Sequence, residues 1–277
     1  MRAHQRYVPL EPRDRTADPL ALEATGALLP TFLCISNGLD GAAETIRRGN
    51  ERVLKARLAD AEFFLTVDRS CSSQERLQQL ERVQFAEGLG SLRQRSQRLS
   101  WLADRLIQAL PLDSDKAADA RRAADLCKHD LVSQMVGEFP ELQGVMGAKY
   151  LLAEGESRAV ALAVGEHYLP RGAGDSLPAS VAGAVVAMAD RLELLLSIFA
   201  KGERPSGSSD PYALRRAGNA VLQILWHHGW TLDLGSLLAD ALAHWHQALP
   251  DLIVNREDLL ADLAEFLRQR VVSLLED

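Results

Sequence analysis

The sequence predicts a mainly α-helical protein, and three observations support this fold class. Apolar residues recur at steps of three and four along most of the 277 residues, which is the spacing of one helix face. Strand-like sequence is confined to residues 4–10 and 31–39. Residues 181–200 are apolar on nearly every side, which is typical of a central buried helix. We expect a helical bundle preceded by a short β-containing segment and followed by an α-helical body segment.

The composition is that of a globular protein of the reducing cytoplasm. Apolar residues make up 47% of the chain, which is enough for a substantial core. Cys34, Cys71 and Cys127 are scattered and show no CxxC spacing, so neither a zinc site nor a disulfide framework is indicated. The sequence has no signal peptide and no run of eighteen apolar residues, so we expect neither secretion nor a membrane span.

The first long helix is expected over residues 42–64, and one of its sides is basic. Three cations follow at steps of four and three and therefore share a face: Arg48, Arg52 and Lys55. The net charge of −7 argues against broad binding to nucleic acid, but a local face such as this one could contact RNA phosphates. Alternatively the face is solvated and internally paired, because Glu44 precedes Arg48 by four residues and Glu51 precedes Lys55 by four.

Helices are also expected over residues 74–85 and 92–110, which the Gly pair in EGLGS separates. The Gly-, Ser- and Pro-rich residues 201–209 mark a boundary. Beyond it Asp210 is expected to cap a helix that Pro211 opens and Gly229 ends, and two more helices follow. We predict three parts: residues 1–68, the end of a sheet-containing domain with a connecting helix; residues 69–202, the helical bundle; and residues 203–277, the start of a helical body.

Residues 126–147 pose the main functional question. They carry an adjacent His129 and Asp130 near the end of a helical pattern, and then Pro140, which is expected near the start of the next helix. Asp130 lies at the edge of a stripe of small apolar residues and should be partly buried. A buried carboxylate needs a partner, which could be a metal ion, an arginine or a helix N-terminus. His167 is expected to face inward as well.

Together His129, Asp130, His167 and Asp190 come in an order similar to the H…HD…D pattern of metal-dependent phosphohydrolases, whose ligands bind a divalent cation that activates water. That pattern also needs a histidine on an earlier helix, and there is none between Gln5 and Lys128. The missing ligand favours a degenerate, structural HD-like cluster with no metal and no catalytic residue. A hydrolytic metal site acting on nucleotides is the alternative.

Several segments resemble the beta subunit of bacterial-type heterotetrameric glycyl-tRNA synthetase. The segments are HQRYVPL at residues 4–10, GNERVLKARLADAEFF at 49–64, MVGEFPELQGVMG at 135–147, EHYLPR at 166–171 and ADRLELLLSIFAKGERPSGSSDPYALRR at 189–216. The resemblance covers most of the chain in the right order. It implies an internal part of that subunit, with an N-terminal portion and a C-terminal anticodon-binding domain outside this sequence.

The resemblance also implies a function. In that family the alpha subunit makes glycyl-adenylate from glycine and ATP with Mg, while the beta subunit binds tRNA(Gly) and is needed for charging. This chain is then expected to be a noncatalytic part of a cytoplasmic glycine–tRNA ligase that binds no cofactor itself. Its expected partners are tRNA(Gly) and the alpha subunit, and its candidate tRNA contacts are Arg48, Arg52, Lys55, Arg215 and Arg216.

One departure from the family concerns the HD-like cluster. Most members have Ala-Asp where this chain has His129 and Asp130. This chain therefore has a histidine, one of the metal-ligand types of the HD pattern, where most members have alanine. The absent first histidine still argues against turnover. A purely structural spacer that keeps an anticodon-binding domain away from the alpha subunit is the remaining alternative.

Overall fold

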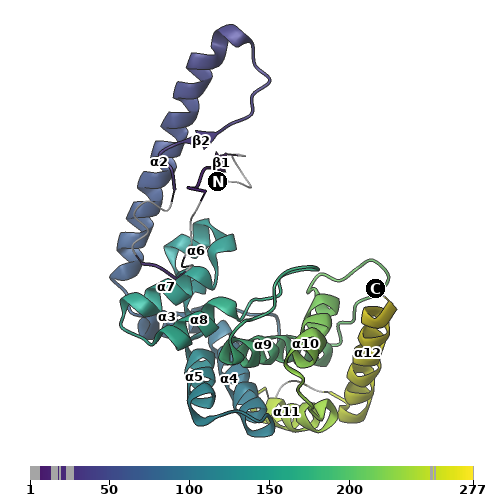
Figure 1. Cartoon of the computed structure of the whole chain (residues 1–277). Helices are drawn as coiled ribbons and strands as arrows, with labels where there is room; N and C mark the ends of the chain where they lie inside the picture. Colours follow the sequence, from purple (N-terminus) through teal and green to yellow (C-terminus); the bar gives the residue numbers. More distant parts are fainter. Residues whose placement is uncertain are drawn as a thin grey trace. The chain divides into compact units, whose positions relative to one another are not determined.

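The computed structural model describes residues 7–13, 18, 20–22, 28–249, 252 and 254–276 (Figure 1). The chain divides into two compact units, Met1–Ser70 and Cys71–Asp277, each with its own packing. Helices dominate the described residues, and strands are limited to one two-stranded sheet, which confirms the predicted fold class. Within the described part of the chain, no helix has both the length and the apolar character needed to cross a membrane.

The first unit contains the small sheet and one long helix. Strands β1 (Val8–Pro9) and β2 (Phe32–Leu33) pair antiparallel, with Val8 opposite Leu33. Both are shorter than the predicted segments, and residues 4–6 lie outside the described residues. The 3₁₀ turn η1 (Asp40–Ala42) then leads into α2 (Ala43–Arg69), which continues five residues beyond the predicted end at residue 64.

The second unit is a helical bundle that begins with α3 (Ser73–Gln79) and the turn η2 (Leu80–Arg82). The remaining elements are α4 (Leu92–Ala109), α5 (Ser114–Leu126), η3 (His129–Val132), α6 (Gln134–Glu138), η4 (Pro140–Leu142), α7 (Val145–Ala153), α8 (Arg158–Glu166), α9 (Val181–Ala200), α10 (Leu214–His228), α11 (Leu234–Ala248) and α12 (Arg256–Glu276). The predicted helix over residues 74–85 is too long, because the chain leaves α3 and forms an antiparallel bridge between Gln84 and Ser91.

Helix α9 is the centre of this unit, as its sequence predicts. It packs against α4, α5, α8, α10 and α12 (Figure 1). Its many alanines present little side-chain bulk and let the neighbouring helices approach closely. Eighteen of its twenty residues are buried, among them the charged residues Asp190, Arg191 and Glu193. A charge in this position needs a partner from another helix.

The start of α10 differs from the prediction. Asp210 does cap the helix, since its carboxylate accepts hydrogen bonds from the backbone N–H groups of Leu214 (2.7 Å) and Arg215 (3.0 Å). The predicted opening at Pro211 is wrong, however, and the helix begins at Leu214. The reason is that Ala213 takes a left-handed conformation with φ of 56°, which cannot belong to the helix itself.

Candidate functional site

His129 lies where α5 stops and the chain turns sharply. Lys128 adopts a left-handed conformation (φ 75°), and His129 then begins the turn η3. Its Nδ1 accepts a hydrogen bond from Arg76 Nε at 3.2 Å, so the ring proton sits on Nε2, which donates to the Gly147 carbonyl at 3.2 Å. Burial, followed by the charge of Arg76, lowers the pKa of His129 to about 3. The imidazole is therefore neutral, and both of its nitrogens are engaged.

Asp130 is fully buried and uses the N-terminus of α7 as its partner. Its Oδ2 accepts hydrogen bonds from the N–H groups of Gly144 (2.6 Å) and Gly147 (3.0 Å). Of the three partners considered for this carboxylate, the helix N-terminus is the one observed, and it suits a negative charge. Burial raises the pKa of the Asp130 carboxyl, and the two backbone hydrogen bonds oppose that shift.

The glycines of this segment make the arrangement possible. Gly144 has φ of +81°, and a Cβ there would lie 2.8 Å from the Tyr168 ring. A Cβ on Gly147 would lie 3.0 Å from Asp130 Oδ2 and 3.3 Å from His129 Nε2. The Gly spacing in ELQGVMG thus lets the start of α7 approach the His-Asp pair closely.

Asp190 belongs to a separate chain of buried ion pairs. Its carboxylate lies 2.9 Å from Lys128 Nζ and 2.9 Å from Arg95 Nη2. Arg95 also pairs with Glu193 at 2.7 Å, and Glu193 in turn pairs with Arg98 at 3.0 Å. Burial would raise the pKa of Asp190, but Lys128 and Arg95 outweigh it and hold the pKa well below its usual range. Asp190 is ionised and fully committed to cations.

His167 faces inward as expected, but it joins neither group as a ligand. Its Nδ1 donates to the Val164 carbonyl at 2.5 Å, and its ring lies 3.9 Å from the ring of Tyr168. Burial lowers the pKa of His167 well below its usual value. Across the residues that the structure describes, no three His, Cys, Asp or Glu side chains are arranged to hold a metal ion.

Several partners of this cluster were not anticipated from the sequence: Arg76, Arg95, Arg98, Lys128 and Glu193. Arg76 contacts His129 across 53 residues of sequence. Arg95 and Arg98 of α4 contact Glu193 of α9 across more than 90 residues. The sequence does contain one signal for the pairing between α4 and α9. Arg95 and Arg98 are three apart on one helix, as Asp190 and Glu193 are on another, so each pair shares a face and the two faces are complementary.

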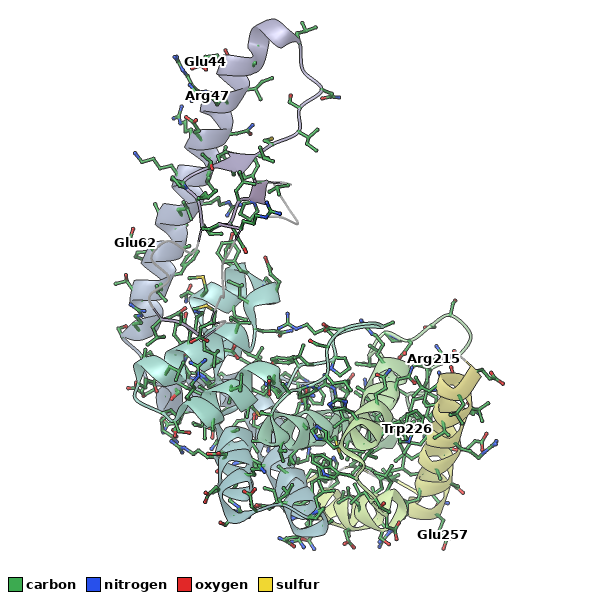
Figure 2. All side chains as sticks on the ribbon, viewed as in Figure 1. Glu44, Arg47, Glu62, Arg215, Trp226 and Glu257 are labelled. Atoms are coloured by element: carbon green, nitrogen blue, oxygen red, sulfur yellow. The ribbon has the colours of Figure 1, made fainter. Side chains whose placement is uncertain are left out.

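The basic side of α2 lies on an exposed helix of the first unit (Figure 2). Arg48 is 75% exposed and pairs with Glu44 at 2.8 Å, as its spacing predicts. Glu51 pairs with Arg47 at 3.0 Å instead of with Lys55. Arg52 and Lys55 are exposed, and within the described part of the chain neither side chain forms a hydrogen bond or ion pair.

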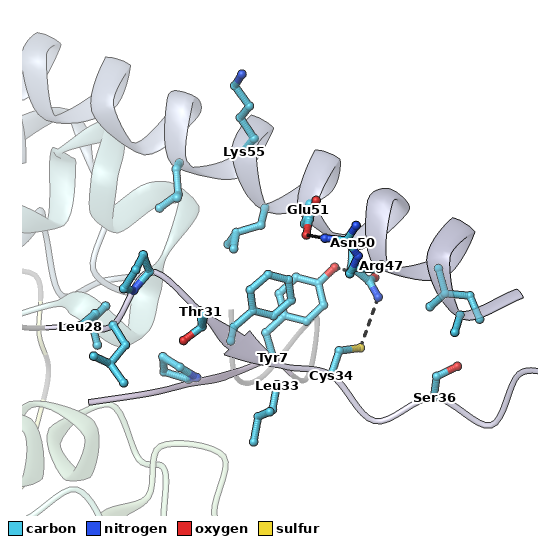
Figure 3. A pocket seen from close by; sticks show the side chains of 18 of the residues that line it. Tyr7, Leu28, Thr31, Leu33, Cys34, Ser36, Arg47, Asn50, Glu51 and Lys55 are labelled. Carbon is cyan, nitrogen blue, oxygen red and sulfur yellow. Dashed lines mark hydrogen bonds and ion pairs between the residues drawn. The ribbon is translucent and has the colours of Figure 1, made fainter. Parts of the chain in front are cut away.

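A neighbouring side of α2 faces β1 and β2 across a largely apolar pocket of 1150 Å³, which Arg47, Glu51 and Lys55 also line (Figure 3). Tyr7 donates a hydrogen bond to Asn50 Oδ1 at 3.0 Å, and its ring lies 4.9 Å from that of Phe32. Asn50 donates to the thiol of Cys34 at 3.4 Å. The Lys55 side chain extends away from the strands in this view. The side of the helix toward the sheet thus combines apolar residues with polar ones such as Asn50, while Arg48 and Arg52 are exposed to solvent.

Arg215, which is labelled in Figure 2, and Arg216 lie in the first turn of α10. Arg216 is exposed and donates to the Arg171 carbonyl at 3.3 Å. Arg215 is half-buried and lines a pocket that also contains residues of α9 and α12. The two neighbouring arginines therefore have different surroundings, which their sequence positions do not reveal.

Comparison with known proteins gives a consistent result. Residues 1–277 match the family model described as glycyl-tRNA synthetase beta subunit. The chain is 46% identical over 275 residues to the glycine–tRNA ligase beta subunit of Trichodesmium erythraeum, a match that covers 99% of this chain and 37% of the relative. The Bacillus subtilis protein of the same description is 40% identical over 272 residues, covering 98% and 38%. The chain spans less than two fifths of the length of these relatives.

Proposed function

The chain belongs to the glycyl-tRNA synthetase beta-subunit family, and from this membership we propose that it is a noncatalytic, tRNA-handling part of a glycine–tRNA ligase. It binds and positions tRNA(Gly), while the alpha subunit, with ATP and Mg, carries out the chemistry. Its other partner is that alpha subunit, and its place of action is the cytoplasm.

The charge distribution along α2 is the observation that carries this proposal. Residues 43–57 hold five cations and two carboxylates, whereas residues 58–69 hold one cation and three carboxylates. Positive charge is therefore concentrated in the first half of an exposed helix. Arg52 and Lys55 are not neutralised by any carboxylate of the described residues, and Arg48 shares Glu44 with Arg47. Lys and Arg side chains of this kind supply the sequence-independent part of RNA affinity through phosphate contacts.

The cluster around His129 has a different role in this proposal, which is to hold the HD-like bundle together. Most of its polar atoms bind arginine, lysine or the backbone of α7, whereas Asp130 Oδ1 and His167 Nε2 are buried without a hydrogen-bond partner. A phosphohydrolase would need His129, Asp130, His167 and Asp190 to present free donor atoms to one cation. His129 has no free nitrogen and Asp190 is bound to Lys128 and Arg95, so the donor set does not suit a metal.

The proposal is tested by reversing the three cations together. We expect R48E/R52E/K55E to weaken tRNA(Gly) binding by at least tenfold in a filter-binding assay, because repulsion replaces attraction at up to three phosphates. The matched control is K116E/R121E/R122E, which makes the same change of charge on exposed residues of α5. Equal affinity of the α2 variant and the wild type would refute the assignment.

A further inference from the structure

A second basic site lies in the other unit, in a pocket of 240 Å³ among α9, α10 and α12. Phe199 and Phe266 form its apolar floor, with their rings 5.2 Å apart in an edge-on arrangement. Its walls are polar and are made by Arg204, Arg215, Asp262, Glu265, Gln269 and Arg270. The pocket thus combines three guanidinium groups with two carboxylates.

The carboxylates of this pocket are already committed. Asp262 accepts from Arg204 Nε at 3.0 Å and from its Nη2 at 2.8 Å, and the remaining nitrogen of Arg204 donates to the backbone. Glu265 accepts from Arg268 and Gln269, each at 2.8 Å. Neither carboxylate is paired with Arg215 or Arg270.

Arg215 and Arg270 therefore remain without a counterion among the described residues. No hydrogen bond or ion pair of either guanidinium is found there, and Nε of Arg270 is fully buried without an acceptor. Buried donors of this kind are normally satisfied. An arginine presents five N–H donors in a fixed fork, so two unpaired forks in one pocket provide a strong anion site.

Gly218 explains how the two arginines come together. It lies three residues after Arg215, on the same face of α10, and a Cβ there would lie 2.9 Å from the Phe266 ring and 3.1 Å from Arg270 Cγ. The absence of a side chain lets α12 pack closely on this face. As a result Arg270 reaches the pocket that Arg215 lines.

We infer that Arg215 and Arg270 together bind one phosphodiester of the RNA backbone, an inference that rests on the proposed function. A phosphodiester offers two non-bridging oxygens, which two guanidinium forks can share through charge-assisted hydrogen bonds. Asp262 and Glu265 also line the pocket but keep their own partners, so the unpaired guanidinium groups of Arg215 and Arg270 are the ones available to the phosphate. A carboxylate from a protein partner has similar chemistry, but the substrate named for the family is an RNA.

The test measures binding of tRNA(Gly) by the native-length protein carrying R215Q/R270Q. We expect the affinity to fall by about ten- to a hundredfold, the loss of one to two charge-assisted hydrogen bonds. The magnitude of the negative slope of log affinity against log salt should decrease by about one, since one phosphate contact is lost. The control is R121Q/R122Q, which removes two exposed, ion-paired arginines from α5 and should leave both quantities unchanged.

The contrary outcomes are distinguishable. If the wild type binds tRNA and R48E/R52E/K55E does not, but R215Q/R270Q retains the wild-type affinity and slope, the pocket assignment is wrong and the proposed function stands. If R215Q/R270Q instead loses only its association with the alpha subunit in co-purification, the pocket takes a protein carboxylate, and the RNA assignment is wrong. A wild type that does not bind tRNA would refute both proposals.

Discussion

Charged residues are used in opposite ways in α2 and in the bundle around α9. On α2 the ion pairs join residues three or four apart and are exposed, as in Arg47 with Glu44 and Glu51. Around α9 they join residues more than 60 apart and are buried, as in Lys128 with Asp190 and in Arg98 with Glu193, where the latter side chains are 2% and 0% exposed. The same residue types thus form a solvated surface on α2 and internal connections around α9, while the outer helices of the second unit also carry exposed pairs such as Lys116 with Asp113.

The energetic consequences should differ accordingly. Exposed pairs contribute little, because solvent screens them and both side chains lose freedom when they pair. A buried pair need not add stability relative to apolar residues, but removing one member leaves an uncompensated charge in a low-dielectric site. Substitutions in the two regions therefore provide a direct way to break or sharpen the comparison.

The largest effect is expected for Glu193→Gln. Glu193 accepts from Arg95, Arg98 and Ser197 and is fully buried. Removing its charge should lower the free energy of unfolding by about 3–5 kcal/mol. The measurement is urea denaturation monitored by circular dichroism. The matched control on α2 is Glu44→Gln, which should cause no measurable change; a similar loss in both variants would contradict the comparison.

A smaller effect is expected for Gly147→Ala. The added methyl group would lie 3.0 Å from Asp130 Oδ2 and would push α7 away from the carboxylate that accepts hydrogen bonds from its N-terminus. We expect a loss of about 1–3 kcal/mol in the free energy of unfolding, the usual range for overpacking, although alanine is the better helix former. Gly137→Ala is the control, since nothing lies within 4 Å of its Cβ position. A Gly147→Ala variant as stable as the control would show that the contact is not tight.

The pH dependence of stability should report on the buried histidines. An unfolded histidine takes up a proton near pH 6.5, whereas His129 stays neutral down to about pH 3 and the pKa of His167 is also lowered. The unfolded state therefore binds more protons, and stability falls as the pH decreases below about 6.5, by at most about 1.4 kcal/mol per pH unit for each histidine. The raised pKa of Asp130 acts in the opposite direction.

The variant His129→Asn separates the two histidines, because its amide oxygen can still accept from Arg76. Urea denaturation at several values between about pH 7 and pH 5 should show a smaller pH dependence in this variant than in the wild type. An unchanged pH dependence would mean that His129 does not remain neutral in the folded protein.

Local patterns were sufficient to predict much of the fold. The spacing of apolar residues predicted α4, the apolar character of residues 181–200 on nearly every side predicted α9, and the i, i+4 spacing predicted the Arg48–Glu44 pair. The inward direction of His167 followed from the same periodicity. These features depend on residues within a few turns of one another, so the sequence contains them directly.

Features that depend on tertiary packing were not predicted. The partners of His129 and Asp190 come from helices far away in sequence, and the left-handed conformations of Lys128 and Ala213 arise where the chain must redirect between packed helices. The choice of Arg47 over Lys55 as the partner of Glu51 depends on side-chain competition that spacing alone cannot decide. The tRNA contacts at Arg48, Arg52, Lys55, Arg215 and Arg216 stay predictions, as do the three parts and the HD-like assignment.

The salt dependence of tRNA(Gly) binding tests the central claim most directly, namely that exposed charges serve RNA and buried charges serve the fold. Log affinity falls as log salt rises, so the slope is negative. We predict that R48E/R52E/K55E makes this slope less steep, reducing its magnitude by about two to three, while His129→Asn leaves the slope at its wild-type value. A wild-type slope in the triple variant, or a reduced slope in His129→Asn, would contradict the account.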